Sequence, residues 1–281
     1  MAYIAVVGAL NIDIIGAPFQ EPLPGDSSPG RVKISAGGVA RNIARSLVQM
    51  GETVQLIAPV GRDAFGAFAR ADCAALRIGL EGALPAETSC RYLGVNGPEG
   101  DLRLAVNDMA AMALLTPEAL EARLPLILGA SLLVLDANLR PDALEYAAQK
   151  AACPVVADPV SAPKAARLAG VMPRLTAVKP NRAEAAALTG LSPDAPQEAL
   201  AGALRAMGAT HVYLSLGASG IAYLGPDGGF TAPGEATRAV NFNGCGDAVT
   251  AAVAHGLKAG LPPREIARLA MRSAARQALE T

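Results

Sequence analysis

Residues 241–248 read Asn241-Phe242-Asn243-Gly244-Cys245-Gly246-Asp247-Ala248, and an apolar, helix-forming run from Val249 to Leu257 follows them. Two glycines around one small residue at a helix start are typical of an anion site, where backbone N–H groups and the helix dipole face a negative charge. Asp247 comes next and could accept a proton from an attacking hydroxyl. This pairing suggests phosphoryl transfer to an alcohol. Glycine and aspartate are also common at ordinary helix N-termini, so this stretch alone leaves both interpretations open.

The composition of the 281 residues permits a large core and gives no sign of a nucleic-acid surface. Hydrophobic residues make up 52% of the chain, yet only 4% are aromatic and none is tryptophan, so the core must consist mainly of aliphatic side chains. The 24 basic and 25 acidic residues give a net charge of −1, without a basic block. We expect no nucleic-acid partner, whereas a small charged substrate remains compatible with this balance.

The four cysteines, Cys73, Cys90, Cys153 and Cys245, lack the spacing of a zinc site or a CxxC redox pair. They indicate reduced thiols and a cytoplasmic protein. Residues 1–10 form a short apolar run without a basic segment before it, which predicts a strand rather than a signal peptide. No uninterrupted apolar run approaches the length of a membrane-spanning helix, so we expect no membrane partner.

Predicted strands and helices alternate along most of the chain. Strands are predicted at 3–7, 54–60, 132–135, 155–157, 177–178, 211–215 and 221–224, with helices at 39–50, 63–71, 142–152, 183–188, 197–207, 248–259 and 264–279. This alternation favours an α/β fold in which helices cover both faces of a mostly parallel sheet, with the strand ends at one edge. Polar residues follow several of these strands: Asn11 and Asp13, Asp136 and Asn138, Asp158, Lys179 and Asn181, and Ser215 with Gly217. Such an edge is where ligands usually bind.

Two segments, 17–35 and 91–106, do not fit this alternation and resemble hairpins; Gly97-Pro98-Glu99-Gly100 is the predicted turn of the second. Together, over about 12–36 and 89–108, they predict a small antiparallel β lid above the site. A closing lid would exclude water and so limit wasteful hydrolysis of a phosphoryl donor. No linker separates the lid from the rest, so we expect residues 1–281 to form a single domain.

Five motifs occur in a characteristic order. They are Asn11-Ile12-Asp13, Gly37-Gly38-Val39-Ala40-Arg41-Asn42, Lys179-Pro180-Asn181-Arg182-Ala183-Glu184, Ser215-Leu216-Gly217-Ala218-Ser219-Gly220, and the stretch at 241–248. In this order they resemble the motifs of the PfkB family of ribokinase-like carbohydrate kinases, and the resemblance extends from Val6 to Arg276. It implies a three-layer ribokinase-like α/β/α fold and phosphorylation of a hydroxyl by ATP with Mg²⁺. It also allows a monovalent cation such as K⁺.

Three further segments are similar to pseudouridine kinases within this family: 106–109, 135–139 and 158–165. This likeness implies phosphorylation of the 5′-hydroxyl of pseudouridine, giving pseudouridine 5′-phosphate. It singles out Asn107, Asp108 and Lys164, with Asn107 reaching the base or the ribose. Three alternatives stay open: a kinase for another nucleoside, a kinase for a free sugar such as ribose, and a sugar- or nucleoside-binding regulator without catalysis.

The resemblance also implies a role for each motif. Asp247 would be the catalytic base, and Gly244, Cys245 and Gly246 would offer N–H groups to the transferred phosphate. Substrate contacts are expected from Asn11, Asp13, Gly37, Gly38, Asn42, Asn107, Asn138 and Asp247. Nucleotide contacts are expected from Lys179, Asn181, Ser215, Gly217, Gly220, Asn243, Gly244 and Gly246. Glu184 and Asn181 would organise Mg²⁺ through water, although their i, i+3 spacing also fits a helix capping box.

Some positions depart from the family pattern. Phe242 and Asn243 stand where a small residue and threonine are usual, and Cys245 replaces the usual alanine. Because a thiol is only slightly larger than a methyl group, we expect the anion site to persist, with altered handling of the nucleotide or cation. The chain ends soon after its last predicted helix, so the wall beside the purine is expected to differ. Many relatives dimerise through the lid, so a homodimer is expected.

Overall fold

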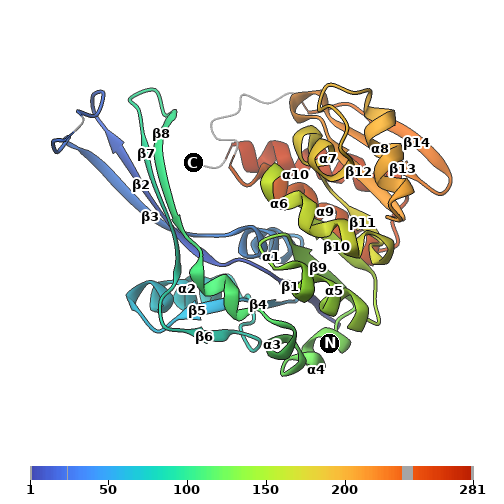
Figure 1. Ribbon diagram of the computed structural model, residues 1–281, viewed down its shortest axis with the longest axis horizontal. Helices are drawn as coiled ribbons and strands as arrows, with labels where there is room; N and C mark the ends of the chain where they lie inside the picture. Colours follow the sequence, from blue (N-terminus) through green and yellow to red (C-terminus); the bar gives the residue numbers. More distant parts are fainter. Residues whose placement is uncertain (1, 24, 236–242, 280–281) are drawn as a thin grey trace.

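The computed structural model describes residues 2–23, 25–235 and 243–279 of the chain. Within these residues the backbone forms a central eight-stranded sheet, a four-stranded second sheet and a short two-stranded pair (Figure 1). Among the described helices, none combines the length and the apolar character that crossing a bilayer requires.

The central sheet has the strand order β14-β13-β12-β11-β10-β9-β1-β4. Its strands are β1 (Ile4–Val7), β4 (Val54–Ile57), β9 (Leu132–Asp136), β10 (Val155–Asp158), β11 (Ala177–Val178), β12 (His211–Ser215), β13 (Ile221–Gly225) and β14 (Gly228–Ala232). The run from β4 to β12 is parallel, and β13 and β14 continue it antiparallel. β1, β9 and β10 are buried along their whole length, which explains their continuous apolar sequences. The predicted mostly parallel sheet is confirmed.

Helices cover both faces of this sheet. One face carries α1 (Val39–Gln49), α2 (Ala64–Ala75), α9 (Cys245–Lys258) and α10 (Pro263–Ala278). The other carries α3 (Pro117–Glu121), α4 (Leu124–Leu128), α5 (Pro141–Lys150), α6 (Ala162–Ala165), α7 (Arg182–Thr189) and α8 (Gln197–Ala206). Side chains of β1 alternate between the two cores, Ile4 toward α1 and Ala5 toward α5, as the pleat requires. The three-layer α/β/α prediction is therefore confirmed.

Helix α9 is the most enclosed helix of its layer. It contacts α1 and α10 on either side and β9 and β10 beneath it. Its residues from Ala248 to Ala254 are all buried, and four of these seven are alanines. Small side chains allow α9 to lie close to the sheet, so the residues at its N-terminus are held firmly in place.

The second sheet consists of β3 (Gly30–Gly37), β2 (Asn11–Pro18), β7 (Cys90–Asn96) and β8 (Leu102–Asp108), in that order. β2 pairs antiparallel with β3 and parallel with β7, and β8 closes the sheet as the antiparallel partner of β7. The sheet projects from the body of the molecule as an arm at the left of Figure 1. It thus consists of two hairpin-like pairs joined by one parallel pairing.

One strand boundary differs from the prediction. The sequence predicts a single strand over 54–60, but β4 ends at Ile57 and β5 (Pro59–Gly61) pairs instead with β6 (Leu84–Ala86). The proline has no backbone N–H for a continuing ladder, which favours a change of partner at this point.

Candidate active site

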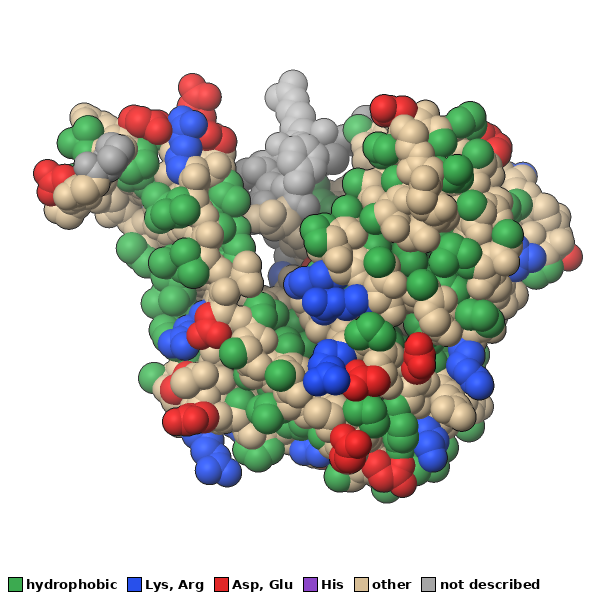
Figure 2. All heavy atoms as spheres, viewed as in Figure 1, with side chains coloured by type: hydrophobic (Ala, Val, Ile, Leu, Met, Phe, Trp, Pro, Cys, Tyr) green, Lys and Arg blue, Asp and Glu red, His purple; other side chains and the backbone are tan. Residues whose placement is uncertain are grey.

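The carboxyl ends of the parallel strands bring the predicted polar residues to one edge of the central sheet. Asp136 ends β9 and Asp158 ends β10, and the two are partners in the strand register. Lys179 directly follows β11, and Ser215 ends β12. This edge faces the arm formed by the second sheet, and Figure 2 shows a cleft between the arm and the body.

The first turns of α1 and α9 meet at this cleft. The amide Nδ2 of Asn42 donates to Oδ2 of Asp247 at 2.9 Å, although the two residues are 205 positions apart in the chain. Asp247 is half-buried. Burial and the nearby charge of Asp158 raise the pKa of Asp247 to about 7, while the hydrogen bond from Asn42 acts in the opposite direction. The carboxylate is therefore basic enough to accept a proton near neutral pH.

The predicted anion site coincides with the start of α9. Gly244 is the N-cap residue and has a left-handed φ of 77°, which glycine adopts without strain. The first N–H groups of a helix have no partner within the helix, and the helix dipole favours negative charge there. The thiol of Cys245 is directed toward α10, with its Sγ 3.5 Å from the carbonyl oxygen of Ala274. Gly244, Cys245 and Gly246 thus occupy the predicted position.

A buried ion pair lies directly under this helix start. Nζ of Lys179 is 3.1 Å from Oδ2 of Asp158, and both side chains are at most 5% exposed. Thr250, one turn after Asp247, donates its hydroxyl to the same carboxylate oxygen at 2.5 Å. A Cβ added to Gly246 would lie 3.2 Å from Nζ of Lys179, so the ammonium group lies just beneath the glycine.

Lys179 carries a positive charge among the carboxylates beneath the start of α9. Burial opposes its positive charge, but Asp158, Glu184 and Asp247 together raise its pKa. The lysine therefore stays protonated and places a fixed positive charge below the helix start, where a phosphate would also be attracted.

Asp13 is a half-buried residue of β2 in the second sheet. Its Oδ1 accepts a hydrogen bond from Nδ2 of Asn11 at 2.6 Å, and burial raises its pKa despite that bond. Gly37 is opposite Asn11 in the ladder, and a Cβ added there would lie 2.2 Å from Oδ2 of Asp13. Gly38 has φ 98° and packs on the carbonyl of Ala9. Glycine is therefore required at position 38, and at position 37 any side chain would displace the Asp13 carboxylate.

Asp136, by contrast, is fully buried, and its carboxylate bonds to three backbone N–H groups and to the side chain of Asn138. Its Oδ2 accepts N–H bonds from Ala9 at 2.8 Å and Ala40 at 3.1 Å, and its Oδ1 accepts one from Asn138 at 2.8 Å. Burial raises its pKa to about 6, against the effect of the bonds from Ala9 and Asn138. This carboxylate ties β9 to the start of α1, so it positions the site without facing the cleft.

The predicted substrate residues Asn138 and Asn107 have different surroundings. Nζ of Lys164 donates to Oδ1 of Asn138 at 2.6 Å, and burial lowers the pKa of Lys164. Asn107 is exposed on β8, but its register with Tyr92, and that of Tyr92 with Asp13, place it on the same face as Asp13. Asp108 points to the opposite face and pairs with Arg91 at 2.7 Å.

Asn181 and Glu184 form a capping box at the start of α7. Oδ1 of Asn181 accepts from the Glu184 N–H, and Oε2 of Glu184 accepts from the Asn181 N–H, each at 2.9 Å. Glu184 is only 4% exposed, and burial raises its pKa. The described residues contain no cluster of three or more ligand-type side chains that could enclose a metal ion. The carboxylate of Glu184 and the amide oxygen of Asn181 are hard oxygen donors of the kind that suits Mg²⁺ held through water.

Ser215 lies beside this capping box. It forms a β-bridge with Asn181, and its N–H donates to the carbonyl of Pro180 at 2.8 Å. Gly217 follows with φ 62° and nothing within 4 Å of an added Cβ, whereas a Cβ on Gly220 would collide with the Ala232 carbonyl at 2.1 Å. Asn243 is exposed just before α9. Phe242 and Asn241 lie outside the described residues.

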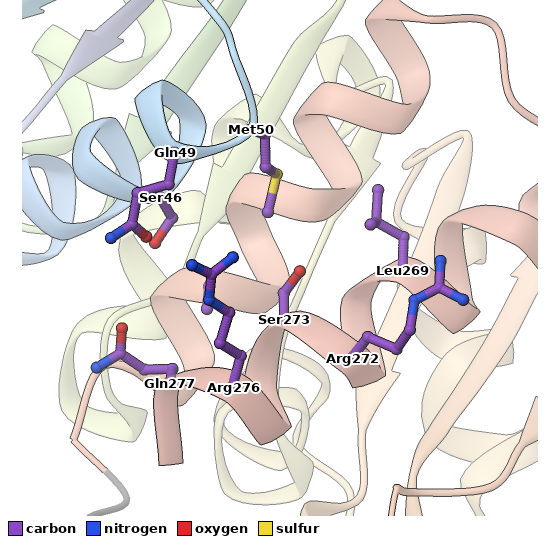
Figure 3. Close-up of a pocket in the computed structure, with 9 residues that line it drawn as sticks. Ser46, Gln49, Met50, Leu269, Arg272, Ser273, Arg276 and Gln277 are labelled. Atoms are coloured by element: carbon purple, nitrogen blue, oxygen red, sulfur yellow. The ribbon is translucent and has the colours of Figure 1, made fainter. Parts of the chain in front are cut away.

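A separate groove lies on the outer side of α9 (Figure 3). Its volume is about 240 Å³. Residues of α1, α9 and α10 line it: Ser46, Gln49, Met50, Ala248, Leu269, Arg272, Ser273, Arg276 and Gln277. None of these was predicted as a site residue, but the groove reaches the start of α9, since a Cβ added to Gly244 would lie 3.6 Å from the side chain of Gln277.

Two contributors to the site have no predicted role in the sequence. The sequence marks Asp158 as a polar strand end and as the first residue of the segment 158–165, but its carboxylate also joins β10, Lys179 and α9. It marks Arg41 only as part of the Gly37–Asn42 motif, yet this arginine is buried and hydrogen-bonded to Asn42. The sequence offers one sign that Arg41 is unusual, namely a charged side chain at the start of a mainly apolar helix. The spacing of residues gives no sign that Asp72 is its partner.

Comparison with known proteins agrees with this geometry. The model of the pfkB family of carbohydrate kinases matches residues 1–281. The chain belongs to this family. It is 31% identical over 275 residues to the pseudouridine kinase of Escherichia coli, covering 95% of this chain and 88% of that protein. It is 32% identical to the pseudouridine kinase of Arabidopsis thaliana over 189 residues, which cover 65% of this chain and 49% of that protein.

The fold agrees with that of solved kinases. The ribokinase structure from Thermotoga maritima superposes with a TM-score of 0.90 at 22% identity and covers 100% of this chain and 94% of that one. At this level of identity the similarity shows the ribokinase-like fold alone. Together with the family match, it makes the chain a phosphotransferase that acts on a hydroxyl acceptor.

The contact between Gly8 and Asp136 gives a first prediction. A Cβ on Gly8 would lie 2.2 Å from Oδ2 of Asp136, so Gly8→Ala should displace the buried carboxylate and lower the free energy of unfolding by roughly 1–3 kcal/mol. Gly202→Ala in α8 meets nothing within 4 Å and should instead raise it by about 0.4–1 kcal/mol. Urea unfolding at pH 7 measures both. Equal stability of Gly8→Ala and the unchanged protein would contradict the packing described.

Proposed function

We propose that the protein transfers the γ-phosphoryl group of ATP to the 5′-hydroxyl of pseudouridine, forming pseudouridine 5′-phosphate and ADP. The observation that carries this proposal is the hydrogen bond between Asn42 and Asp247 at the N-terminus of α9. This bond holds a carboxylate with a raised pKa at the helix start, which supports the proposed roles of Asp247 as the base and of the helix start as the phosphate site. The choice of pseudouridine is supported by the relatives from Escherichia coli and Arabidopsis thaliana, whose names specify this substrate.

In the proposed reaction Asp247 accepts the proton of the 5′-hydroxyl as the oxygen attacks the γ-phosphorus. The bond from that phosphorus to the β,γ-bridging oxygen breaks, and ADP leaves with the electron pair. Backbone N–H groups of Gly244, Cys245 and Gly246 bond the oxygens of the transferred phosphoryl group, and Lys179 adds positive charge from below. A base with a pKa near the working pH suits this task.

The nucleotide would lie along the ends of β11 and β12. We assign its contacts to Lys179, Asn181, Ser215, Gly217, Gly220, Asn243, Gly244 and Gly246. Mg²⁺ would neutralise the phosphate charge, held by phosphate oxygens and by water bonded to Asn181 and Glu184. The remaining assignment, a monovalent cation such as K⁺ near the start of α9, is supported only by the family resemblance.

The nucleoside would lie between the second sheet and the strand ends. Asp13 and Asn42 would bind the ribose hydroxyls, with Asn11 orienting Asp13 and with Gly37 and Gly38 allowing close approach. Asn138, which follows β9 of the central sheet, and Asn107, on β8 of the second sheet, would contact the rest of the nucleoside. In this arrangement the second sheet, over about 12–36 and 89–108, acts as a lid within a single domain.

The outer face of the lid would bind a second copy of the chain. Two rows on that face carry mostly apolar side chains: Ile34, Ile14, Leu93 and Val106, and then Val32, Gly16, Val95 and Leu104. Val32 is 71% exposed and Leu104 is 62% exposed. Figure 2 shows hydrophobic side chains along this arm. An apolar patch of this extent is unusual on a monomer and suits a homodimer.

Cys73, Cys90 and Cys153 are free thiols, which supports the further proposal that the enzyme acts in the reducing cytoplasm. Phosphorylation of another nucleoside or of a ribose-like sugar is the nearest competing activity, because Asp13 and Asn42 would bind ribose in any of these substrates. A binding regulator without catalysis is less well supported, because the helix start and Asp247 are both in place.

A substrate panel tests the proposed reaction. ADP formation is measured with pseudouridine, uridine, adenosine, guanosine and ribose at equal concentrations, with ATP and Mg²⁺. We expect the highest kcat/KM with pseudouridine. A higher kcat/KM with another acceptor would replace pseudouridine as the substrate, and no ADP formation with any acceptor would favour the regulator.

Removing the base gives a second test. Asp247→Asn keeps the size of the side chain but removes its basicity, so kcat should fall by roughly 10²–10⁴-fold while substrate binding changes little. In the unchanged enzyme kcat/KM should fall as the pH drops below about 7, because the protonated carboxyl cannot accept the proton. Asp194→Asn, an exposed carboxylate before α8, is the control and should retain full activity. Near-normal turnover of Asp247→Asn would contradict the assignment.

The dimer is tested separately by the molar mass in solution. Leu104→Glu should convert a dimer into a monomer, because a charge would enter the apolar lid face. Leu128→Glu, at another exposed leucine at the end of α4 (Leu128 is 50% exposed), should leave the dimer intact. Size-exclusion chromatography with light scattering distinguishes the two. A monomeric unchanged protein at micromolar concentration, or a Leu104→Glu dimer, would exclude this interface.

A further inference from the structure

Arg41 is a buried arginine without a role in the proposed reaction. It lies in the first turns of α1, directly before Asn42, and is only 6% exposed. A guanidinium group is always charged, so its burial is costly unless each side of the group finds an acceptor. Two acceptors are present, and they connect Arg41 to the candidate base.

The first acceptor is Asp72 on α2. Nε of Arg41 donates to Oδ2 of Asp72 at 3.0 Å, and Nη2 donates to Oδ1 at 2.8 Å. This two-point pairing fixes the plane of the guanidinium group, because both bonds must be kept at once. The Asp72 side chain is 24% exposed, so the pair is shielded from solvent mainly on the arginine side.

The second acceptor is the side-chain amide of Asn42. Nη1 of Arg41 donates to Oδ1 of Asn42 at 3.2 Å, while Nδ2 of Asn42 donates to Oδ2 of Asp247 at 2.9 Å. Arginine has only donors, so the end of the amide that faces it must be the oxygen. With the amide reversed, two donors would face each other at Arg41 and two acceptors at Asp247.

We propose that Arg41, anchored by Asp72, is a positioning residue for Asp247 and acts through Asn42. It fixes the orientation of the Asn42 amide so that an N–H always faces the carboxylate. That bond sets the orientation of the base and favours its unprotonated form. The inference rests on the proposed function for the role of Asp247, but the chain of contacts from Asp72 to Asp247 stands apart from the identity of the acceptor.

Other charged groups also face Asp247 and must be held constant in any test. They are Asp158 from the end of β10, Lys179 after β11 and Asp136 from the end of β9. None of them bonds to Arg41, Asp72 or Asn42 through its side chain in the described contacts. Substitutions at Arg41 and Asp72 therefore alter the hydrogen bond from Asn42 to Asp247 and leave these three groups in place.

The test uses Arg41→Lys and Asp72→Asn, with pseudouridine or whichever acceptor the substrate panel identifies. In Arg41→Lys the ammonium group can pair with Asp72, but it lacks the planar set of donors that would also bond Asn42 in a fixed orientation. In Asp72→Asn the neutral amide would no longer hold the arginine by charge. For both variants we expect kcat to fall roughly tenfold to a hundredfold, the magnitude of a hydrogen bond to a charged group. KM for the acceptor should change less, and the acid limb of the kcat/KM profile should move to higher pH.

Arg70→Met, an exposed arginine on α2, is the matched control and should behave like the unchanged enzyme.

A double-substitution cycle separates positioning from a merely structural role. In an Asn42→Ala background, Arg41→Lys should cause little further loss of kcat and no further shift of the acid limb, because the intermediary is gone. An equal fold loss in both backgrounds, or an unshifted acid limb in the single variants, would overturn the proposal. Thermal unfolding of each variant identifies one that fails to fold, and Asp72→Asn then carries the test.

The positioning role of Arg41 can also be tested without measuring catalytic activity. If the unchanged protein phosphorylates no acceptor, the proposed function fails, while the pKa of Asp247 can still be followed by NMR of carboxyl-labelled aspartate. A higher pKa of Asp247 in Arg41→Lys and in Asp72→Asn would support the positioning role. An identical titration in the unchanged protein and in both variants would overturn it.

Discussion

The carboxylate of Asp158 is bonded from three sides, and the geometry of the site depends on it. Its Oδ1 accepts the Val160 N–H at 2.8 Å, and its Oδ2 receives both Thr250 and Lys179. A buried carboxylate that lost its charged partner would cost several kcal/mol, so the three elements it joins are coupled strongly. Val160 has φ 68°, a strained value for a β-branched residue, and the bond to Asp158 helps to hold it there.

The position of α9 follows from this coupling. Thr250 ties the helix to β10, and Lys179 lies directly beneath Gly246, so the N-terminus of α9 sits at a fixed height above the strand ends. Asp136 does the same for α1 by bonding the N–H of Ala40. With both helix starts fixed on neighbouring strands, Asn42 and Asp247 come within hydrogen-bond distance despite their separation in the chain. The proposed base and the proposed ribose contact are thus brought together by rigid elements rather than by a loop.

Much of this arrangement could be predicted from the sequence because the signals are local. The alternation of strands and helices predicted the parallel sheet, and strand-end polar residues such as Asp158 and Lys179 predicted the edge. The glycines at 37, 38 and 244 were recognisable because each precedes a helix. The capping box of Asn181 and Glu184 was visible from spacing alone.

The remaining features depend on contacts between distant segments. Nothing near Arg41 in the sequence points to Asp72 or shows that the arginine orients Asn42. The roles of Asp158 and Asp136 as buried bonding centres also require three-dimensional partners, since a polar residue at a strand end is equally compatible with a ligand contact. The break between β4 and β5 was missed because the apolar pattern continues across Pro59, although the hydrogen-bond partner changes.

In the proposed reaction Asp247 acts on the acceptor hydroxyl while the N-terminus of α9 holds the phosphate that this hydroxyl attacks. A crystal structure of the protein with pseudouridine and a non-hydrolysable ATP analogue tests it most directly. We expect the 5′-oxygen within about 3 Å of a carboxylate oxygen of Asp247, with the γ-phosphate oxygens facing the N–H groups of Gly244 to Gly246. A 5′-hydroxyl directed away from Asp247, or a triphosphate bound elsewhere than at this helix start, would contradict it.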